Sequence, residues 1–167
     1  MAAFCADVLP RLRARRPDTK LAIVGADPPA AVRALAKLAG VAVTGSVSDV
    51  RPYLRSAAVL AVPVRIGGGT RFKVVEGLAM GKAMVSTSLG CEGIAVRDRE
   101  HLLIADDPAT FAARVLELFA DPARGQALGA AGRALIEREY SWELAGGALE
   151  ALYARIAKLE LHPPVRA

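Results

Sequence analysis

The stretch "AVLAVPVRIGGGTRFKVVEGLAMGKAMVST", residues 58–87, decides the fold class of this chain. Its first seven residues, 58–64, are apolar throughout, which is typical of a strand buried on both faces of a sheet. Glycines follow at 67–69, and residues 71–80 show the spacing of a helix. A second apolar strand is predicted at 83–87. Strand, loop, helix and strand in this order predict a parallel sheet covered by helices on both faces.

The same alternation extends outward along the chain. Further strands are predicted at 20–26, 41–45 and 101–105, and further helices at 2–14, 27–38 and 48–56. Asp27 is the expected N-cap of the helix at 27–38 because Pro28 follows it. Asp107 and Asp121, each followed by proline, should start two more helices, and Ser141 should cap a third. The expected fold is α/β, a Rossmann-like doubly wound parallel sheet with a C-terminal helical segment from about residue 107.

The domain plan follows from length and composition. A chain of 167 residues with 53% apolar residues is the size of one domain with one core. We expect a single domain over residues 1–160 and a disordered tail at 161–167.

The order of elements at the amino end predicts a gap in the sheet. In a doubly wound sheet of order 3-2-1-4-5-6, a helix such as 2–14 follows the central strand 1, and no such strand precedes it in this sequence. The segments at 20–26 and 58–64 would then be strands 2 and 4, with unpaired apolar edges between them. Two outcomes remain open: these strands close up and pair directly, or the isolated chain is poorly stable and self-associates.

The net charge of +5 favours an anionic partner, which could be nucleic acid, membrane lipid or a phosphate-bearing small molecule. Nucleic acid is disfavoured because its binding needs exposed aromatic rings among the cations. Aromatic residues make up 5% of this chain, and four of them lie in apolar surroundings that predict core positions: Phe4, Tyr53, Phe72 and Phe111.

A basic cluster at the end of the first helix leaves two alternatives open, a solvated helix end and a contact with anionic lipid. Its members are Arg11, Arg13, Arg15 and Arg16. The longest apolar run, 57–64, is too short to span a membrane, and the amino end lacks the order of a secretory signal. We expect a cytoplasmic protein, with peripheral contact at the inner face of the membrane as the second alternative. Cys5 and Cys91 lack metal-ligand spacing and are expected to be two buried thiols.

The glycine loop at 67–69 points to a phosphate site. Ligands of open parallel sheets bind beyond the carboxyl ends of the strands, where this loop lies. Glycines let a ligand approach the main chain closely, and the start of the following helix favours anions. Arg71 and Lys73 add positive charge. Glu76 lies one helical turn further on, where its carboxylate can accept hydrogen bonds from the hydroxyl groups of a ribose.

These residues also allow other interpretations. The P-loop pattern is absent, and the dinucleotide-binding fingerprint lacks its third glycine because Phe72 stands there. A plain glycine-rich turn with solvated Arg71, Lys73 and Lys82 stays open. His101 is expected to be a surface or turn residue rather than a catalytic base, and Glu92 either reaches the ligand or belongs to a polar turn.

One longer pattern resembles a known family. Residues 62–94, "VPVRIGGGTRFKVVEGLAMGKAMVSTSLGCEGI", carry most of the resemblance, supported by "LAIVGADPP" at 21–29, "EHLLIADDPATFA" at 100–112 and "YSWE" at 140–143. In this order they are similar to the carboxyl-terminal half of a group 1, or family 4, glycosyltransferase. These are retaining enzymes of GT-B architecture, in which two Rossmann-like domains face each other. The resemblance covers essentially the whole chain.

The resemblance implies a site for the nucleotide-diphospho-sugar donor. The family signature is a glutamate, seven residues and a second glutamate; the second matches Glu76, whereas Gly68 stands in the place of the first. This departure resembles the branch with a "GGGTR-K" loop, in which main-chain amides contact the diphosphate. The implied diphosphate residues are Gly67, Gly68, Gly69, Thr70, Arg71 and Lys73. The implied ribose ligand is Glu76, and the implied base pocket is Gly45, Ser46 and Val47.

The resemblance also implies an activity. Transfer in this family needs no metal and no cofactor, and the main catalytic groups are expected in the amino-terminal GT-B domain, which is missing from this sequence. The acceptor is expected to be a glycan, a lipid-linked sugar or a similar molecule in cell-envelope or exopolysaccharide synthesis. The alternative is a stand-alone nucleotide-binding or assembly module with no transferase activity.

Overall fold

The computed structural model describes residues 1–67, 69 and 71–160, with side chains to residue 157. Gly68, Thr70 and the predicted tail at 161–167 lie outside the described residues. Among the described residues, five short strands form the centre, and all their ladders are parallel. They are β1 (Leu21–Ile23), β2 (Val41–Val43), β3 (Leu60–Val62), β4 (Met84–Ser86) and β5 (Leu103–Ile104). An α/β fold with parallel strands is therefore confirmed.

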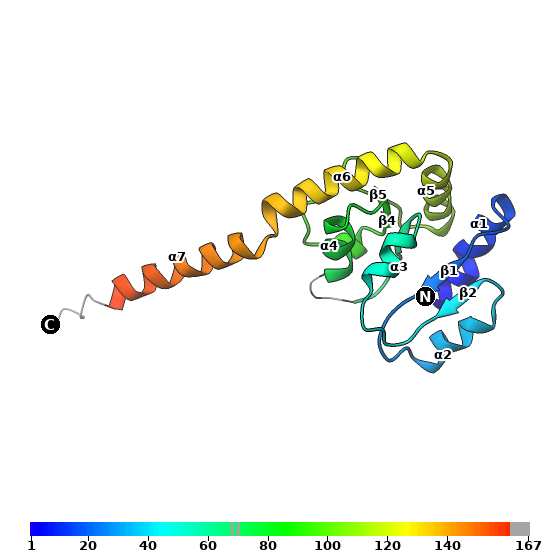
Figure 1. The fold of residues 1–167 in the computed structure, drawn as a ribbon, viewed down its shortest axis with the longest axis horizontal. Helices are drawn as coiled ribbons and strands as arrows, with labels where there is room; N and C mark the ends of the chain where they lie inside the picture. The colour runs from blue at the N-terminus through cyan, green and yellow to red at the C-terminus, as the bar shows by residue number, and fades with distance from the viewer. Residues whose placement is uncertain (68, 70, 161–167) are drawn as a thin grey trace.

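The strands form two sheets, divided at the gap that the order of elements predicted. In the described part of the chain, β1 pairs with β2 in one sheet, and β3, β4 and β5 form the other in that order. Figure 1 shows β1 and β2 as a group apart from β4 and β5. The expectation that residues 20–26 and 58–64 close up and pair directly is therefore wrong.

The amino-terminal helix connects the two sheets on one face. It consists of a π-helical turn, η1 (Phe4–Val8), and α1 (Leu9–Arg15). Phe4 and Val8 belong to the core under β4 and β5, where Phe4 meets Phe111 of α5 (Pro108–Ala120) edge to face at 5.7 Å. Cys5 and Leu9 instead pack with Val41 under the other sheet. One helix thus belongs to both cores.

A third core of the described residues lies between the larger sheet and helices α4 (Phe72–Ala79) and α6 (Pro122–Glu139). Val74 and Leu78 of α4 are fully buried there. Gly77 lets α4 approach the sheet, since a Cβ at this position would lie 2.4 Å from Leu60 Cδ2. The apolar face of α4 is thereby fixed against the strands, which leaves its other face to solvent.

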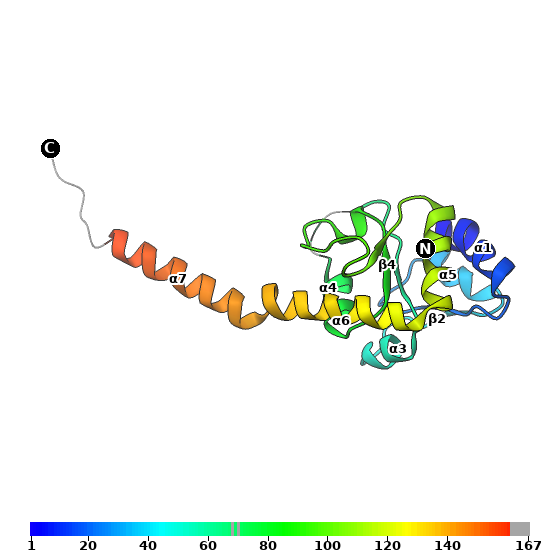
Figure 2. The same cartoon turned by 90° about the horizontal axis from the view of Figure 1, so that it is seen from above.

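The carboxyl-terminal helices begin where their capping residues predict. The side chain of Asp107 accepts hydrogen bonds from the main-chain N–H groups of Ala109 and Thr110 at the start of α5, and Asp121 accepts one from Arg124 at the start of α6. Ser141 Oγ accepts one from Leu144 N in α7 (Trp142–Glu160). Helix α7 extends away from the rest of the molecule in both views (Figures 1 and 2).

Two predicted helices begin later than expected. Asp27 has a positive φ of 45° and caps no helix; α2 (Ala30–Arg33) starts after Pro29 and continues as a 3-10 turn, η2 (Ala34–Lys37). Pro29 is the physical reason, because a proline pushes the residue before it out of the helical region. Helix α3 (Arg51–Ser56) starts three residues after Ser48, where Asp49 accepts a hydrogen bond from Arg51 N.

The four aromatic residues expected in the core divide into buried and exposed side chains. Phe4 and Phe111 are buried, whereas Tyr53 is 38% exposed and Phe72 is 64% exposed, so two of the four core predictions are wrong.

In the basic cluster, Arg13 donates to the carbonyl of Ala39 and Arg16 lies over the ring of Phe119. These two arginines therefore have contacts within the fold, and a contact of the cluster with anionic lipid stays a prediction.

Both cysteines are buried free thiols, and burial raises the pKa of each. Among the described residues, no helix has the length and apolarity needed to cross a membrane.

Candidate functional site

The predicted site residues lie at one end of a large cavity. The cavity has a volume of about 1840 Å³ and runs between β1 and β3 toward α4. At the end beyond the carboxyl terminus of β3, it is lined by Arg71, Lys73 and Glu76. The structure thus brings the two cations and the acid together at the sheet edge where parallel strands bind ligands.

The loop between β3 and α4 has a conformation that needs glycine. Gly67 has a φ of 131° and Gly69 a φ of 86°, both in the region that side chains with a Cβ resist. The start of the loop is held by Thr87, whose Oγ1 donates to the carbonyl of Val64 at 2.6 Å. The loop therefore leaves a fixed strand end and reaches the helix through positions that other residues would strain.

Arg71 is the N-cap residue of α4, and its side chain is only 8% exposed. Its Nη2 donates to the carbonyl of Gly67 at 2.8 Å and lies 3.8 Å from Oε2 of Glu92. Arg71 thus holds the glycine loop from inside, in addition to placing charge at the cavity. Glu92, for which sequence left two roles open, lies beside Arg71, and a contact of Glu92 with the ligand stays a prediction.

Lys73 and Glu76 form the exposed side of α4. They are three residues apart, so they lie on the same helix face. Both are exposed and both line the cavity, whereas Val74 and Leu78 point into the core. The helix therefore presents a cation in its first turn, near the anion-favouring N-terminus, and a carboxylate in the next turn.

The remaining predicted residues lie elsewhere. Gly45, Ser46 and Val47 follow β2 and do not line the cavity in the described part of the chain. Lys82 is not simply solvated, because its Nζ donates to the carbonyl of Ala57 at 2.6 Å and burial lowers its pKa.

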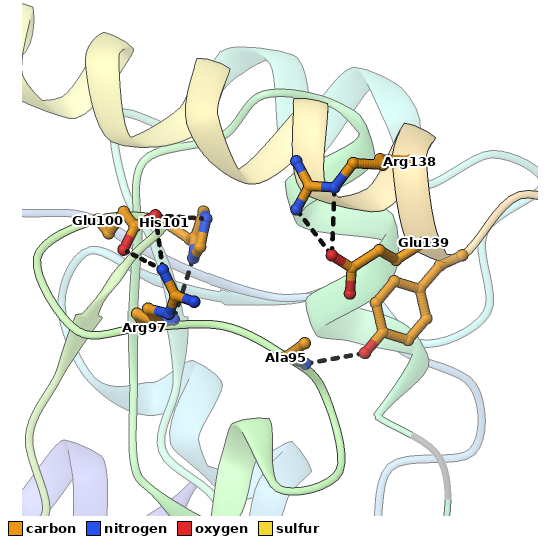
Figure 3. A network of polar contacts seen from close by, with 7 residues as sticks. Ala95, Arg97, Glu100, His101, Arg138 and Glu139 are labelled. Atoms are coloured by element: carbon orange, nitrogen blue, oxygen red, sulfur yellow. Dashed lines mark hydrogen bonds and ion pairs between the residues drawn. The ribbon is translucent and has the colours of Figure 1, made fainter.

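His101 is buried, contrary to the surface position expected for it. Its Nδ1 accepts a hydrogen bond from Arg97 N at 3.0 Å, and its Nε2 lies 3.5 Å from Glu100 (Figure 3). The main-chain N–H of Ala95 in the same loop donates to the hydroxyl of Tyr140 at 2.8 Å. His101 therefore shapes the loop before β5, and in the described part of the chain it does not line the cavity; its exclusion as a catalytic base stays a prediction.

Sequence reasoning missed two features of the site. Asp106, the second residue after β5, accepts hydrogen bonds from Ser88 N and Ser88 Oγ at 2.7 Å and lines the cavity. Its position just beyond a predicted strand was the signal that could have found it. The second feature is the exposure of Ile66 (93%) and Phe72 (64%), two apolar side chains beside the glycine loop.

The described residues contain no group of three His, Cys, Asp or Glu side chains placed to hold a metal ion. The prediction that the reaction needs no metal stays a prediction.

Comparison with known proteins matches this chain to a family. The family described as glycosyl transferases group 1 matches residues 1–121. A GDP-mannose-dependent monoacylated alpha-(1-6)-phosphatidylinositol monomannoside mannosyltransferase of Corynebacterium glutamicum is 31% identical over 157 residues. That alignment covers 83% of this chain and 39% of the relative, so the chain spans well under half of the relative's length.

Solved structures show the same fold. The C-terminal domain of the glycosyl transferase group 1 family protein LpcC from Francisella tularensis superposes with a TM-score of 0.67 at 15% identity, over 84% of this chain and 76% of that domain. HepE of Anabaena, solved in complex with UDP, superposes with a TM-score of 0.75 at 13% identity, over 89% of this chain and 44% of HepE. The fold matches one half of a GT-B structure.

Proposed function

Because the chain belongs to the group 1 glycosyltransferases and corresponds to their carboxyl-terminal half, we propose that it binds the nucleotide-diphospho-sugar donor of a retaining sugar transfer. One observation carries this proposal: Arg71, Lys73 and Glu76 line one end of a cavity at the carboxyl edge of parallel strands. The name of the Corynebacterium relative includes GDP-mannose, and HepE was solved with UDP, so a nucleoside diphosphate is the common chemistry.

Each residue has a role that its geometry permits. Lys73, exposed in the first turn of α4, binds the diphosphate together with the main-chain N–H groups at the helix start. Glu76, exposed one turn later, accepts hydrogen bonds from the ribose hydroxyls. Arg71 holds the glycine loop through Gly67 and adds positive charge that stabilises the leaving diphosphate. The transferred sugar goes to a glycan or lipid-linked acceptor bound by the other half of the enzyme.

Calorimetry on single-residue variants tests the roles of Lys73 and Glu76. Lys73→Ala should weaken UDP and GDP binding by about 10-fold or more and leave uridine and guanosine binding unchanged, because a charge-assisted hydrogen bond is lost only with the phosphates. Glu76→Ala should weaken nucleosides and nucleoside diphosphates alike. Lys37→Ala is the matched control, since Lys37 is exposed and does not line the cavity.

Arg71 requires a comparison of two variants because it also supports the loop. Arg71→Ala should weaken nucleoside diphosphates and spare nucleosides, and Arg71→Lys should recover part of the loss because the charge remains. Equal losses for nucleoside and nucleoside diphosphate in Lys73→Ala and Arg71→Ala would contradict the proposed roles.

A further inference from the structure

Glu92 lies in a loop that is fixed on both sides of it. The loop follows β4 and contains a 3-10 turn, η3 (Leu89–Cys91), whose C-cap residue is Glu92. Cys91, directly before Glu92, is buried, and Ile94, two residues after it, packs against the same core cluster. The side chain of Glu92 itself is 68% exposed. The fold therefore holds the main chain at Glu92 in place and leaves its carboxylate in solvent.

This loop also packs directly on the end of β3. Gly90 N donates to Thr87 Oγ1 at 3.0 Å, and Thr87 Oγ1 in turn donates to the carbonyl of Val64. A Cβ at Gly90 would lie 2.8 Å from the carbonyl oxygen of Val62, so the contact needs glycine. Because β3 and β4 are parallel neighbours, the loops that follow them leave the sheet at the same edge. The loop of Glu92 and the glycine loop are therefore joined at their bases.

Arg71 connects the same two loops further out. Its Nη2 donates to the carbonyl of Gly67 in the glycine loop and lies 3.8 Å from Oε2 of Glu92 in the loop after β4. The distance to Glu92 is longer than a hydrogen bond, so the two groups attract each other through charge. The carboxylate of Glu92 is thus positioned by Arg71 while its oxygens can still accept hydrogen bonds from a ligand.

The charged residues beside the glycine loop follow a definite order. Lys73 and Glu76 line the cavity, which lies on the β1 side of β3. Glu92 comes from β4, on the other side of β3, and in the described part of the chain it does not line the cavity. Arg71 joins the two sides, because it lines the cavity and also contacts Glu92. Across the site, the order of charges is therefore carboxylate, cations, carboxylate.

A nucleotide-diphospho-sugar presents groups in a matching order, with ribose hydroxyls at one side of the diphosphate and sugar hydroxyls at the other. A carboxylate beside the phosphates repels them, so Glu92 is a poor ligand for the diphosphate itself. Carboxylates accept strong hydrogen bonds from hydroxyl groups. Since the proposed function assigns Glu76 to the ribose, the second carboxylate is left for the sugar.

We propose that Glu92 binds hydroxyl groups of the transferred sugar and that Arg71 positions its carboxylate for this contact. A site that hydrogen-bonds a hydroxyl discriminates against sugars that lack it or place it elsewhere, so Glu92 contributes to the choice of donor sugar. This inference rests on the proposed function, because the diphosphate of the same donor must bind at Arg71 and Lys73.

Glu92→Gln tests the proposal, because the amide keeps the size of the side chain and removes its charge. Calorimetry compares UDP with UDP-glucose, and GDP with GDP-mannose. The variant should weaken at least one of the two nucleotide sugars by about 10-fold and should weaken neither nucleoside diphosphate, since only the sugar loses a charge-assisted hydrogen bond. The melting temperature should stay that of the wild type, because the Glu92 side chain is exposed.

Glu137→Gln is the matched control. Glu137 is 61% exposed and paired with an arginine, as Glu92 is, but it lies on α6 and does not line the cavity in the described part of the chain. This variant should bind all four ligands as the wild type does.

The other results separate the alternatives. Equal losses for nucleotide sugar and nucleoside diphosphate in Glu92→Gln would show that Glu92 acts only through Arg71, and tighter binding of all four ligands would show that Glu92 competes with the phosphates; either result overturns the proposal. If the wild type binds these ligands and Glu92→Gln changes none of them, this inference fails and the proposed function stands. If the wild type binds none of the four, the proposed function fails and this inference fails with it.

Discussion

The guanidinium of Arg71 shows how one residue of the site can serve both structure and binding. It donates to Gly67 at 2.8 Å, lies 3.8 Å from Glu92 and is almost completely buried. Burying a charge is costly unless it is paired and hydrogen-bonded, and both contacts reduce that cost. Lys73 has no such structural task because its side chain is exposed. Under the proposed function, loss of Lys73 therefore reports on ligand binding alone, whereas loss of Arg71 also reports on the loop.

Asp107 provides a prediction about pH at the residue scale. Hydrogen bonding from Thr110 above all, and from Ala109 N, holds the pKa of Asp107 below its ordinary value of 3.8. A carboxylate with a depressed pKa in the folded state stabilises the fold above its unfolded pKa, and this contribution is lost as pH falls through the lower folded value. Asp107→Asn keeps an N-cap but does not titrate.

The wild type and Asp107→Asn should therefore differ in melting temperature within a defined pH range. At pH 7, Asp107→Asn should melt below the wild type by about 1–2 °C, and the difference should shrink as pH falls below about 4. Thermal melting followed by circular dichroism measures both curves. A difference that stays constant down to about pH 3 would show that the charge of Asp107 does not contribute.

At the scale of elements, the contact between α4 and α6 depends on glycine. Gly125, Gly129 and Gly132 recur along one face of α6 and are buried. A Cβ at Gly129 would lie 2.1 Å from the carbonyl oxygen of Gly81, and one at Gly132 would lie 2.6 Å from Leu78 Cδ2. These distances are too short for a side chain, so the backbone of α6 lies directly on the end of α4 and the turn after it. This contact fixes the helix that carries Lys73 and Glu76.

Gly129→Ala is expected to destabilise the protein by about 1–3 kcal/mol, because the added methyl group overlaps a main-chain atom. Helix propensity alone acts in the other direction, because it favours alanine over glycine in a helix by about 1 kcal/mol. Gly146→Ala is the matched control, since Gly146 also lies in a helix and has no atom within 4 Å of an added Cβ. Urea unfolding should show a loss for Gly129→Ala and none for Gly146→Ala. Equal behaviour of the two variants would contradict the close contact.

Sequence alone predicted the elements better than it predicted their assembly. Asp107 and Asp121 were found as helix starts because capping depends on neighbouring residues, and the apolar strands were found because parallel strands are buried on both faces. The start of α2 was missed because Pro29 overrides the cap expected at Asp27. The gap between the two sheets was predicted from the order of elements, but whether β1 and β3 pair directly across it was left open, because pairing joins residues distant in the chain. At the site, the positions of Lys73 and Glu76 followed from helix spacing, whereas the burial of Arg71 required the folded loop.

At the scale of the whole molecule, the consecutive helices α6 and α7 differ in how much of their surface is buried in the core. Helix α6 contributes Leu128, Leu135 and Ile136 to the buried residues. Helix α7 contributes none to the three core clusters of the described chain, and Trp142 at its start is 88% exposed. The two views show it extending beyond the body of the molecule (Figures 1 and 2). The fold that carries the site is therefore complete without α7.

A chain that ends at Ser141 should keep its stability and its site. Its melting temperature should lie within about 2 °C of that of the full chain, because no core residue is removed and Tyr140 still accepts the hydrogen bond from Ala95. Its affinity for UDP and GDP should be unchanged. A chain that ends at Asp121 is the control and should not fold cooperatively, since it loses the whole of α6 and with it the support of α4. If the chain ending at Ser141 also failed to melt cooperatively, α7 would have to pack on the body of the molecule in solution.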